Sequence, residues 1–143
     1  MQLVKHLLAR KGTEIWSIDS REPVLTAIRI MAERGVGALP VTSEGRLAGI
    51  ISERDYARKV ILLGRASADT PVSQIMSAPV VTVGPDEPVR RCMRIMTDKR
   101  IRHLPVLDSD GAMVGVISIG DLVRAVIEEQ QETIAQLEKF IAG

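Results

Sequence analysis

The sequence predicts a mixed α/β (α+β) fold built from two copies of one unit, each a strand, a helix, two strands and a second helix (βαββα). First, Leu39-Pro-Val41 recurs 65 positions later as Leu104-Pro-Val106. Second, the repeat continues past a one-residue insertion, where Gly49-Ile-Ile-Ser52 matches Gly115-Val-Ile-Ser118. Third, β-branched apolar runs alternate with stretches whose apolar residues recur every three or four positions. One repetition of this length indicates a two-copy module and not a solenoid.

The first copy is expected over residues 1–64, including an N-terminal helix that ends near Gly12. Its second helix starts between Ser20 and Pro23, because proline is tolerated in the first turn. In chain order, the sequence predicts a helix at 2–10, a strand at 15–18, a helix from 20–23 onward, strands at 38–41 and 47–52, and a helix at 54–63.

Residues 65–71 are polar and rich in turn-forming residues, so they are expected to link the copies. The second copy spans residues 72–127, and Val72, Ile75 and Met76 repeat the apolar pattern of the N-terminal helix. It should begin with a strand at 80–83. A helix capped by Asp86 should follow, with its buried face formed by Val89, Cys92, Met93 and Met96. A hairpin at 103–118, with its second strand at 113–117, and a helix from about Gly120 complete the copy.

An apolar stripe of Ile134, Leu137 and Ile141 continues past the end of the second copy. Residues 128–143 are therefore predicted to form a C-terminal helical extension, which serves association or packs on its own module. Each half is too small to bury its helices alone. The halves are expected to pack together through their sheets about a pseudo-twofold axis.

Composition excludes several classes of function. The chain of 143 residues is 45% hydrophobic, with a formal net charge of +1 and one residue each of Trp, Tyr and Phe. Nothing in this charge balance attracts nucleic acid or an anionic membrane, and few aromatics are available to stack on bases. The single Cys92 suits a reducing compartment. With neither a long apolar run nor the apolar core of a signal peptide, a cytoplasmic protein is expected.

A Ser-x-x-Asp motif occurs at the start of the last helix of each copy, as Ser52 with Asp55 and Ser118 with Asp121. One interpretation is structural, because this spacing forms a capping box at helix N-termini. The other is a binding site. A hydroxyl at a helix N-terminus suits a phosphate, and a carboxylate suits a ribose diol. Duplication of the motif favours a ligand that bears both sugar and phosphate.

The segment Lys99-Arg-Ile-Arg-His103 is a basic cluster in the second copy only. If the segment is extended, Arg100 and Arg102 lie on one side of it, where their guanidinium groups can bind phosphate oxygens. The alternative is a solvated basic turn. The matching residues of the first copy are Gly35, Gly37 and Ala38, so the two copies differ here.

Other motifs point to no catalytic or metal site. Gly35-Val-Gly-Ala-Leu-Pro40 lacks the third glycine of a dinucleotide fingerprint and leads from helix to strand. Cys92 lies on an apolar helix face and is expected in the core. The histidines and Cys92 lack metal-ligand spacing, and Asp108-Ser-Asp-Gly111 is expected to be an ordinary turn. We therefore expect no enzyme, no metal and no catalytic cofactor.

These residues resemble a tandem pair of cystathionine-β-synthase-type (CBS) domains, which together form a Bateman module. The resemblance rests on both Leu-Pro-Val segments and on the matching segments 49–55 and 115–121, and it covers residues from about Val4 to Ile127. It implies two βαββα units with two clefts between them. It also implies a regulatory role and adenosine ligands, among them AMP, ADP, ATP, a dinucleotide or S-adenosylmethionine.

The resemblance also assigns roles by position. It places Asp55 and Asp121 on ribose hydroxyls and Ser52 and Ser118 near the phosphate. It places each aspartate in a cleft with the first strand of the other copy, whose backbone binds the adenine edge. These strands are Val80, Val81 and Thr82 for Asp55, and Ile15, Trp16 and Ser17 for Asp121.

Arg102 and His103 occupy positions that commonly meet the phosphates in proteins of this kind. The first copy departs from this pattern at Gly37 and Ala38. The resemblance therefore implies that the two sites differ in occupancy, or that the first has room for a ligand larger than AMP.

The sequence thus predicts a stand-alone, non-enzymatic regulatory module that binds an adenine nucleotide. AMP is the first expectation, with ADP, ATP or NAD(H) as alternatives. A homodimer through helical faces is expected, together with an unidentified regulated protein and without nucleic acid or membrane partners. The competing hypothesis is a structural protein–protein adaptor whose clefts stay empty. A nucleotide-hydrolysing enzyme ranks third because the chain lacks a Walker motif.

Overall fold

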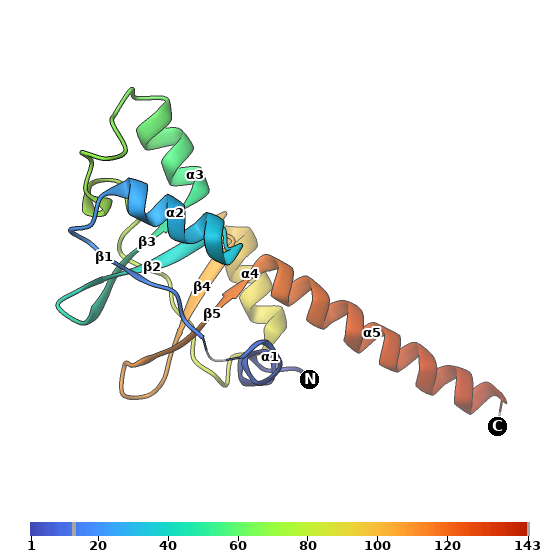
Figure 1. Ribbon diagram of the computed structural model, residues 1–143. Helices are drawn as coiled ribbons and strands as arrows, with labels where there is room; N and C mark the ends of the chain where they lie inside the picture. Colours follow the sequence, from blue (N-terminus) through green and yellow to red (C-terminus); the bar gives the residue numbers. More distant parts are fainter. Residues whose placement is uncertain (13, 143) are drawn as a thin grey trace. The chain divides into compact units, whose positions relative to one another are not determined.

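The computed structural model describes residues 1–12 and 14–142 and has a mixed α+β fold (Figure 1). The chain divides into two compact units. The middle unit spans residues 15–81, and the terminal unit joins residues 1–14 to residues 82–143. Both ends of the chain therefore belong to the same unit.

The middle unit follows the predicted order of a strand, a helix, two strands and a helix. Its elements are β1 (Ile18–Asp19), α2 (Val24–Arg34), β2 (Ala38–Ser43), β3 (Arg46–Ser52), α3 (Glu53–Tyr56), the π-helical turn η1 (Ala57–Ile61) and the 3₁₀ turn η2 (Val72–Gln74). The sheet order is β1-β2-β3, with β1 parallel to β2 and β3 antiparallel to it. In the antiparallel ladder, Ala38 lies opposite Ser52.

The terminal unit repeats this arrangement without the first strand, so its sheet contains β4 and β5 alone within the described residues. Its elements are α1 (Val4–Lys11), α4 (Val89–Lys99), β4 (His103–Leu107), β5 (Met113–Ser118) and α5 (Ile119–Ala142). Strands β4 and β5 pair antiparallel with His103 opposite Ser118, which matches Ala38 opposite Ser52. Both ladders also carry an irregularity at matching places, after Val41 and after Val106.

The segments that precede the first strands pack in matching ways. Val4 and Val72 are both fully buried. The backbone N–H of Val4 donates to Glu87 O at 2.9 Å, and that of Val72 donates to Glu22 O at 2.8 Å. This confirms that residues 72–76 repeat the pattern of the N-terminal helix. The repeat boundaries expected from the sequence (1–64 and 72–127) differ from the packing units, because residues 1–14 belong to the terminal unit and residues 72–81 to the middle unit.

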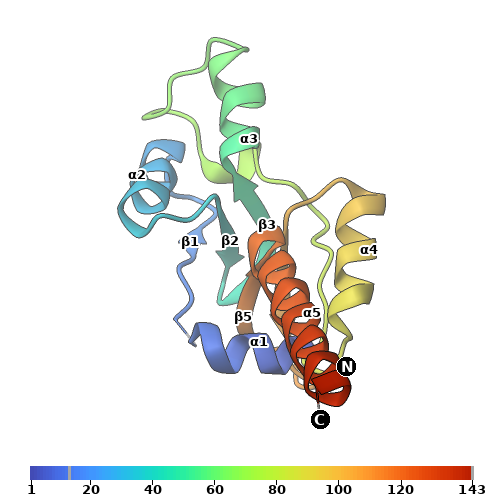
Figure 2. The same ribbon diagram turned by 90° about the vertical axis from the view of Figure 1, so that its right-hand side faces the viewer.

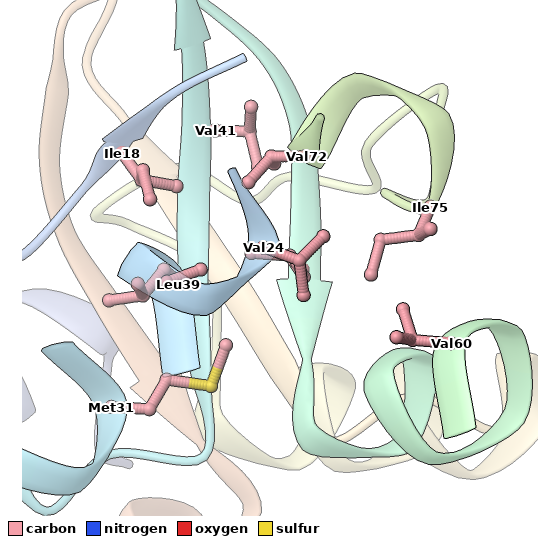
Figure 3. Packing of buried hydrophobic residues seen from close by; sticks show 10 residues of the cluster. Ile18, Val24, Met31, Leu39, Val41, Val60, Val72 and Ile75 are labelled. Carbon is pink, nitrogen blue, oxygen red and sulfur yellow. The ribbon is translucent and has the colours of Figure 1, made fainter. Parts of the chain in front are cut away.

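The core of the middle unit is aliphatic, as the scarcity of aromatic residues requires. Figure 3 shows its side chains converging from α2, from the sheet and from the turns η1 and η2. Burying such side chains stabilises the fold by about 1.5–3 kcal/mol each. The buried cluster consists of Ile18, Val24, Ala27, Met31, Leu39, Val41, Ile51, Val60, Val72 and Ile75.

Helix α5 runs on past the rest of its unit as a single long helix (Figures 1 and 2). Its buried residues, Leu122 and Ala125, lie in the first two turns. The stretch from Gln130 to Ala142 is exposed throughout. The predicted helical extension is thus present.

Several local predictions were wrong. Residues 15–18 yield only the two-residue β1, and residues 80–83 form no strand but a single bridge from Val83 to Val106. By contrast, the helix predicted at about 54–63 is confirmed to within two residues, because α3 and η1 together cover residues 53–61. Asp86 does not cap α4, whose N-cap residue is Pro88, and it forms an ion pair with Lys5 at 3.1 Å instead.

Candidate functional site

Two matching turns join the last strand of each unit to the helix that follows. We call them the first Ser–Asp turn (Ser52–Asp55) and the second Ser–Asp turn (Ser118–Asp121). The N–H of Ser52 donates to Asp55 Oδ2 at 3.0 Å, and the N–H of Asp55 donates to Ser52 Oγ at 3.2 Å. The same two bonds measure 2.8 Å and 3.2 Å in the second turn. Both turns are capping boxes, so the structural interpretation of the motif is confirmed.

In the first turn, both oxygens of the Asp55 carboxylate have partners. Oδ2 accepts from Ser52, while Oδ1 accepts from Ser77 Oγ at 3.3 Å and lies 3.1 Å from Lys59 Nζ. Lys59 is four residues further along the chain and also donates to Ile75 O at 3.0 Å. The carboxylate is buried, with its side chain 12% exposed. Ser77 and Lys59 thus hold Asp55 in one orientation.

In the second turn, the partner of Asp121 comes from the other end of the chain. Lys11, at the end of α1, donates to Asp121 Oδ2 at 2.7 Å and to Val116 O at 2.8 Å. Burial by itself raises the pKa of Asp121, but the hydrogen bonds from Lys11 and Ser118 outweigh it and leave the pKa below its ordinary value. These contacts are made by Oδ2, so the Oδ1 oxygen of Asp121 has more capacity left to accept a hydrogen bond than either oxygen of Asp55.

The basic side chains predicted to meet phosphate lie beside the second turn. His103 lies opposite Ser118 in the ladder, and the carbonyl of Arg102 accepts from the N–H of Ile119 at 2.9 Å. Burial lowers the pKa of His103, and the positive charges of Lys11 and Arg102 lower it further, against the opposing effect of Asp121. At neutral pH the imidazole is therefore uncharged.

The first turn has the same backbone geometry without these side chains. The carbonyl of Gly37 accepts from the N–H of Glu53 at 3.1 Å, and Ala38 lies opposite Ser52. At these two backbone contacts the copies are alike, and they differ in the side chains at positions 37 and 38 against 102 and 103. The predicted placement of Arg100 was wrong: it ends α4 in the left-handed conformation, at φ 57°, and is not part of an extended segment with Arg102.

The segments predicted to bind the adenine edge are irregular. Within the described residues, Val80 to Thr82 and Ile15 to Ser17 belong to no strand, so their backbone groups are not committed to a sheet. Val80 and Val81 share the middle unit with Asp55, and they follow Ser77, which donates to Asp55. Ile15 to Ser17 and Asp121 belong to different units. Their pairing stays a prediction.

Trp16 has a second partner besides the core. The guanidinium of Arg34 lies 3.9 Å from the centre of its ring, within cation–π distance.

Sequence reasoning missed three residues at the turns. Lys59 lies at the i,i+4 spacing from Asp55, and this signal was available in the sequence. Lys11 and Ser77 gave no such signal, because their partners are distant in sequence. In each unit, a side chain of the leading segment packs closely against a glycine of the strand that precedes the Ser–Asp turn. A Cβ on Gly49 would lie 2.5 Å from Met76 Sδ, and one on Gly115 would lie 2.5 Å from Leu8 Cδ2. The glycines therefore let the leading segments reach the turns.

Cys92 and the Asp108–Gly111 turn have the predicted structure. Cys92 is buried, and burial raises the pKa of its thiol to about 11, which makes it a poor nucleophile. Asp108 Oδ1 accepts from the N–H groups of Asp110 and Ala112, as in an ordinary turn. Among residues 1–12 and 14–142, no three side chains of His, Cys, Asp or Glu lie close enough together to hold a metal ion. In the same residues, no helix is both long and apolar enough to cross a membrane.

The two turns offer a definite chemistry. Each presents a carboxylate and a hydroxyl at the start of a helix, with an ammonium group beside the carboxylate. A carboxylate accepts hydrogen bonds from a vicinal diol, and an ammonium group or a helix N-terminus favours an anion. The second turn adds the guanidinium of Arg102 and the neutral imidazole of His103, both of which carry N–H donors.

Comparison with known proteins identifies the repeated unit. The family profile described as CBS domain matches residues 4–61 and again residues 72–128. The mitochondrial CBS domain-containing protein CBSX3 of Arabidopsis thaliana is 44% identical over 137 residues, which are 92% of this chain and 66% of that protein. The chain thus spans somewhat less than two thirds of the length of this plant relative.

Solved structures share the fold. A putative signal-transduction protein with CBS domains from Burkholderia ambifaria superposes with a TM-score of 0.86 at 46% identity, covering 90% of this chain and 96% of that one. The CBS domain pair of protein MJ0100, solved with 5-methylthioadenosine and S-adenosyl-L-methionine, gives a TM-score of 0.80 at 27% identity. That comparison covers 90% of this chain and 98% of the other.

Proposed function

Because this chain belongs to the CBS domain family and carries a pair of these domains, a regulatory module, we propose that it binds an adenosine-containing ligand at its Ser–Asp turns. The observation that carries the proposal is the duplicated turn, in which a buried or half-buried aspartate is held in one orientation at the start of a helix. Such a carboxylate is preorganised for a ribose diol. The MJ0100 domain pair, which holds two adenosine derivatives, supports the same ligand class.

AMP is the ligand that best matches the second turn. Asp121 receives the ribose hydroxyls on Oδ1, and Ser118, Arg102 and His103 supply donors for one phosphate. In the first turn, Gly37 and Ala38 replace the basic pair. We therefore propose that this turn favours an adenosine ligand with less charge or more bulk. ADP, ATP and NAD(H) are the alternatives there.

The proposed module regulates and does not catalyse. The thiol of Cys92 is buried, and its raised pKa makes it a poor nucleophile. We propose that an unidentified regulated protein, and not nucleic acid or a membrane, receives its signal. The cytoplasmic location expected from the sequence stays a prediction, because the name of the plant relative places that protein in mitochondria.

We also propose that two copies of the chain associate through helical faces. In the middle unit, Ile61, Leu62 and Leu63 are exposed at the end of η1. In the terminal unit, Val123 and Ile127 are exposed on α5. Exposed apolar groups of this size favour a protein interface.

A structural adaptor with empty sites is the second candidate, and a specific observation favours it. In both turns the aspartate and serine already satisfy each other, and a lysine neutralises the carboxylate. Such a turn has a complete structural explanation without any ligand. The adaptor and the nucleotide sensor therefore differ in ligand binding and not in fold.

Ligand-dependent thermal stability separates the two candidates. A ligand that binds only the folded state adds RT ln(1 + [L]/Kd), about 2.7 kcal/mol at a hundredfold excess over Kd. We expect AMP and adenosine to raise the melting temperature, while uridine does not. Asp121→Ala should reduce the AMP shift, whereas Asp110→Ala, a matched loss of an exposed turn carboxylate in the same unit, should leave it unchanged. Equal curves with and without every adenosine compound favour the adaptor.

A further inference from the structure

Helix α5 carries an exposed apolar stripe that its own unit does not cover. Ile127 is 48% exposed, Ile134 55%, Leu137 56% and Ile141 83%. Only the first two turns of α5 contribute buried residues. A helix that extends this far without packing is marginal in water, so the stripe needs a surface to pack against.

The stripe has the spacing of a coiled-coil seam. Ile127, Ile134 and Ile141 recur every seven residues, and Val123, Gln130 and Leu137 form a second such series. The two series alternate at intervals of three and four, which are the a and d positions of a heptad. Isoleucine occupies the three successive a positions from Ile127 to Ile141, and β-branched residues are common at a positions of such seams. The occupant that this pattern fits is another helix with the same pattern.

We propose that α5 pairs with α5 of a second copy of this chain as an antiparallel coiled coil. In this register each a residue packs on a d residue of the second copy: Ile127 on Leu137, Ile134 on Gln130 and Ile141 on Val123. The contact is symmetric about a twofold axis. Both copies therefore bury the same surface, and the assembly closes at two chains.

Charge complementarity determines the orientation. In the antiparallel pair, the flanking Arg124 of one copy faces Glu138 of the other, and the axis creates this ion pair twice. The opposite flank brings the half-buried Val126 against Phe140, whose side chain is 86% exposed in one chain. A parallel pair would place Arg124 beside Ile119 and Glu138 beside Thr133, so it lacks both contacts.

The first turns of α5 offer a groove for the incoming helix end. Its walls include Val123, Arg124 and Ile127, which are d, e and a positions of the seam, and the flanking Ile119. In the antiparallel register the residues that enter this groove are Leu137 and Ile141 of the second copy. Two exposed apolar residues of α5, which are 56% and 83% exposed in one chain, thereby reach this groove.

The mass of the full chain in solution tests the seam without any ligand. We expect light scattering to give the mass of two chains for the wild type. Leu137→Glu should weaken association at least tenfold, because it places an unpaired charge in the seam. The matched control Gln136→Glu adds the same charge on the outward side of α5 and should leave the mass unchanged. Circular dichroism checks that both variants fold, which is expected because both positions are exposed.

The orientation is tested by charge reversal and by cross-linking. Arg124→Glu or Glu138→Arg alone should weaken the dimer, and the two together should restore it. Cys92 is buried and is the only cysteine, so engineered thiols can be followed separately. A variant with Val123→Cys and Ile141→Cys should oxidise to a linked dimer, while Ile141→Cys alone should not. Rapid linking of the single variant indicates a parallel pair and overturns the proposal.

This inference rests on the proposed self-association and not on nucleotide binding, and the outcomes separate them. A wild-type chain that stays monomeric overturns both the helical-face dimer and the α5 seam. A dimer whose mass is insensitive to Leu137→Glu overturns the seam alone. The thermal response to AMP bears on neither.

Discussion

Asp121 combines a structural and a proposed binding role in one carboxylate. Its Oδ2 caps α5 and accepts from Lys11, while its Oδ1 is the oxygen that we assign to a ribose hydroxyl. Asp55 has no such division, because Ser52, Ser77 and Lys59 engage both of its oxygens. The two turns therefore look alike in sequence but differ in the acceptor capacity left for a ligand.

This difference predicts unequal effects of removing each carboxylate. Asp121→Ala should destabilise the fold by about 1 kcal/mol through the lost cap. Its AMP affinity should fall by about 1.5–3 kcal/mol, or roughly tenfold to a hundredfold. Compared with Asp121→Ala, Asp55→Ala should lower the free energy of unfolding more and the AMP affinity less. Denaturant unfolding and calorimetric titration give the two quantities. Unchanged AMP affinity in the Asp121 variant would assign the turn to helix capping alone.

His103 gives the second turn a pH signature. Its pKa is lowered, first by burial and then by Lys11 and Arg102, so the folded chain holds the neutral imidazole. The unfolded chain takes up a proton near pH 6.5, and the folded chain does so only at lower pH. This contribution to stability is therefore complete above pH 6.5 and is lost as the pH falls below it. Urea unfolding of the wild type and of His103→Asn at pH 7.5 and 5.5 should show the loss in the wild type alone.

Bound AMP should favour the protonated form of His103 over the neutral form, because its phosphate stabilises the imidazolium. The affinity of the wild type for AMP should then rise, relative to His103→Asn, between pH 7.5 and 5.5. The comparison with the variant removes the titration of the phosphate itself, which has a pKa near 6. Adenosine, which lacks the phosphate, should show no such gain. An identical pH profile in both proteins would remove His103 from the phosphate site.

At the residue scale, the sequence predicted what depends on local spacing. Ser52 with Asp55 and Ser118 with Asp121 form the capping boxes that the Ser-x-x-Asp spacing indicates. Lys11 could not be assigned to Asp121, because the two are far apart in sequence and only tertiary packing joins them. Residue spacing thus carries information on contacts within a turn and none on distant partners.

At the scale of single elements, α2 and α4 end in the same way with different residues. Gly35 ends α2 at φ 64°, and Arg100 ends α4 at φ 57°, both in the left-handed region. Glycine adopts this conformation freely, whereas an L side chain there costs about 1–2 kcal/mol. The repeat alignment shows only that Gly35 and Arg100 differ, and it does not show that both adopt the left-handed conformation.

We therefore predict that Arg100→Gly stabilises the chain. The gain should be about 0.5–1 kcal/mol, because the greater freedom of glycine in the unfolded chain offsets part of the relief. Gly35→Ala is the matched control in the other copy and should destabilise. Thermal unfolding of both variants checks the signs. A destabilised Arg100→Gly variant would show that the arginine side chain makes a contact worth more than the strain.

The glycines of β3 and β5 should respond differently to an added methyl group. The three atoms nearest a Cβ on Gly115 all belong to the Leu8 side chain, whereas those nearest a Cβ on Gly49 include the backbone oxygen of Ser77 at 3.0 Å, besides Met76. Overpacking costs about 1–3 kcal/mol, and backbone cannot move aside as a side chain can. Gly49→Ala should therefore destabilise more than Gly115→Ala in urea unfolding. The reverse order would contradict this assignment.

Element boundaries were predicted where an element has its own periodicity. Both hairpins and the helices α2, α4 and α5 follow their apolar patterns. The strand predicted at 80–83 failed, because only Val83 finds a bridge partner, and a run of valines cannot reveal that. Asp86 was expected as a cap, but Pro88 begins the helix and Asp86 pairs with Lys5.

At the scale of the whole molecule, the repeat can be recognised from the sequence, but the two packing units cannot. Val4 and Val72 occupy matching buried places, yet Val4 belongs to the unit that contains the second hairpin. A repeat alignment shows which segments are alike. It does not show which copy each leading segment packs on, because both have the same apolar pattern. The family and the βαββα unit were therefore predictable, and the division of the chain was not.

The central claim is that the Ser–Asp turns bind the ribose of an adenosine ligand, and calorimetric titration with AMP and with 2′,3′-dideoxy-AMP tests it most directly. The second compound keeps the base and phosphate but lacks the diol. The hydrogen bonds from the diol to the carboxylate together contribute about 1.5–3 kcal/mol, so the dideoxy compound should bind roughly tenfold to a hundredfold more weakly. Equal affinity for the two nucleotides, or binding of neither, would contradict the account.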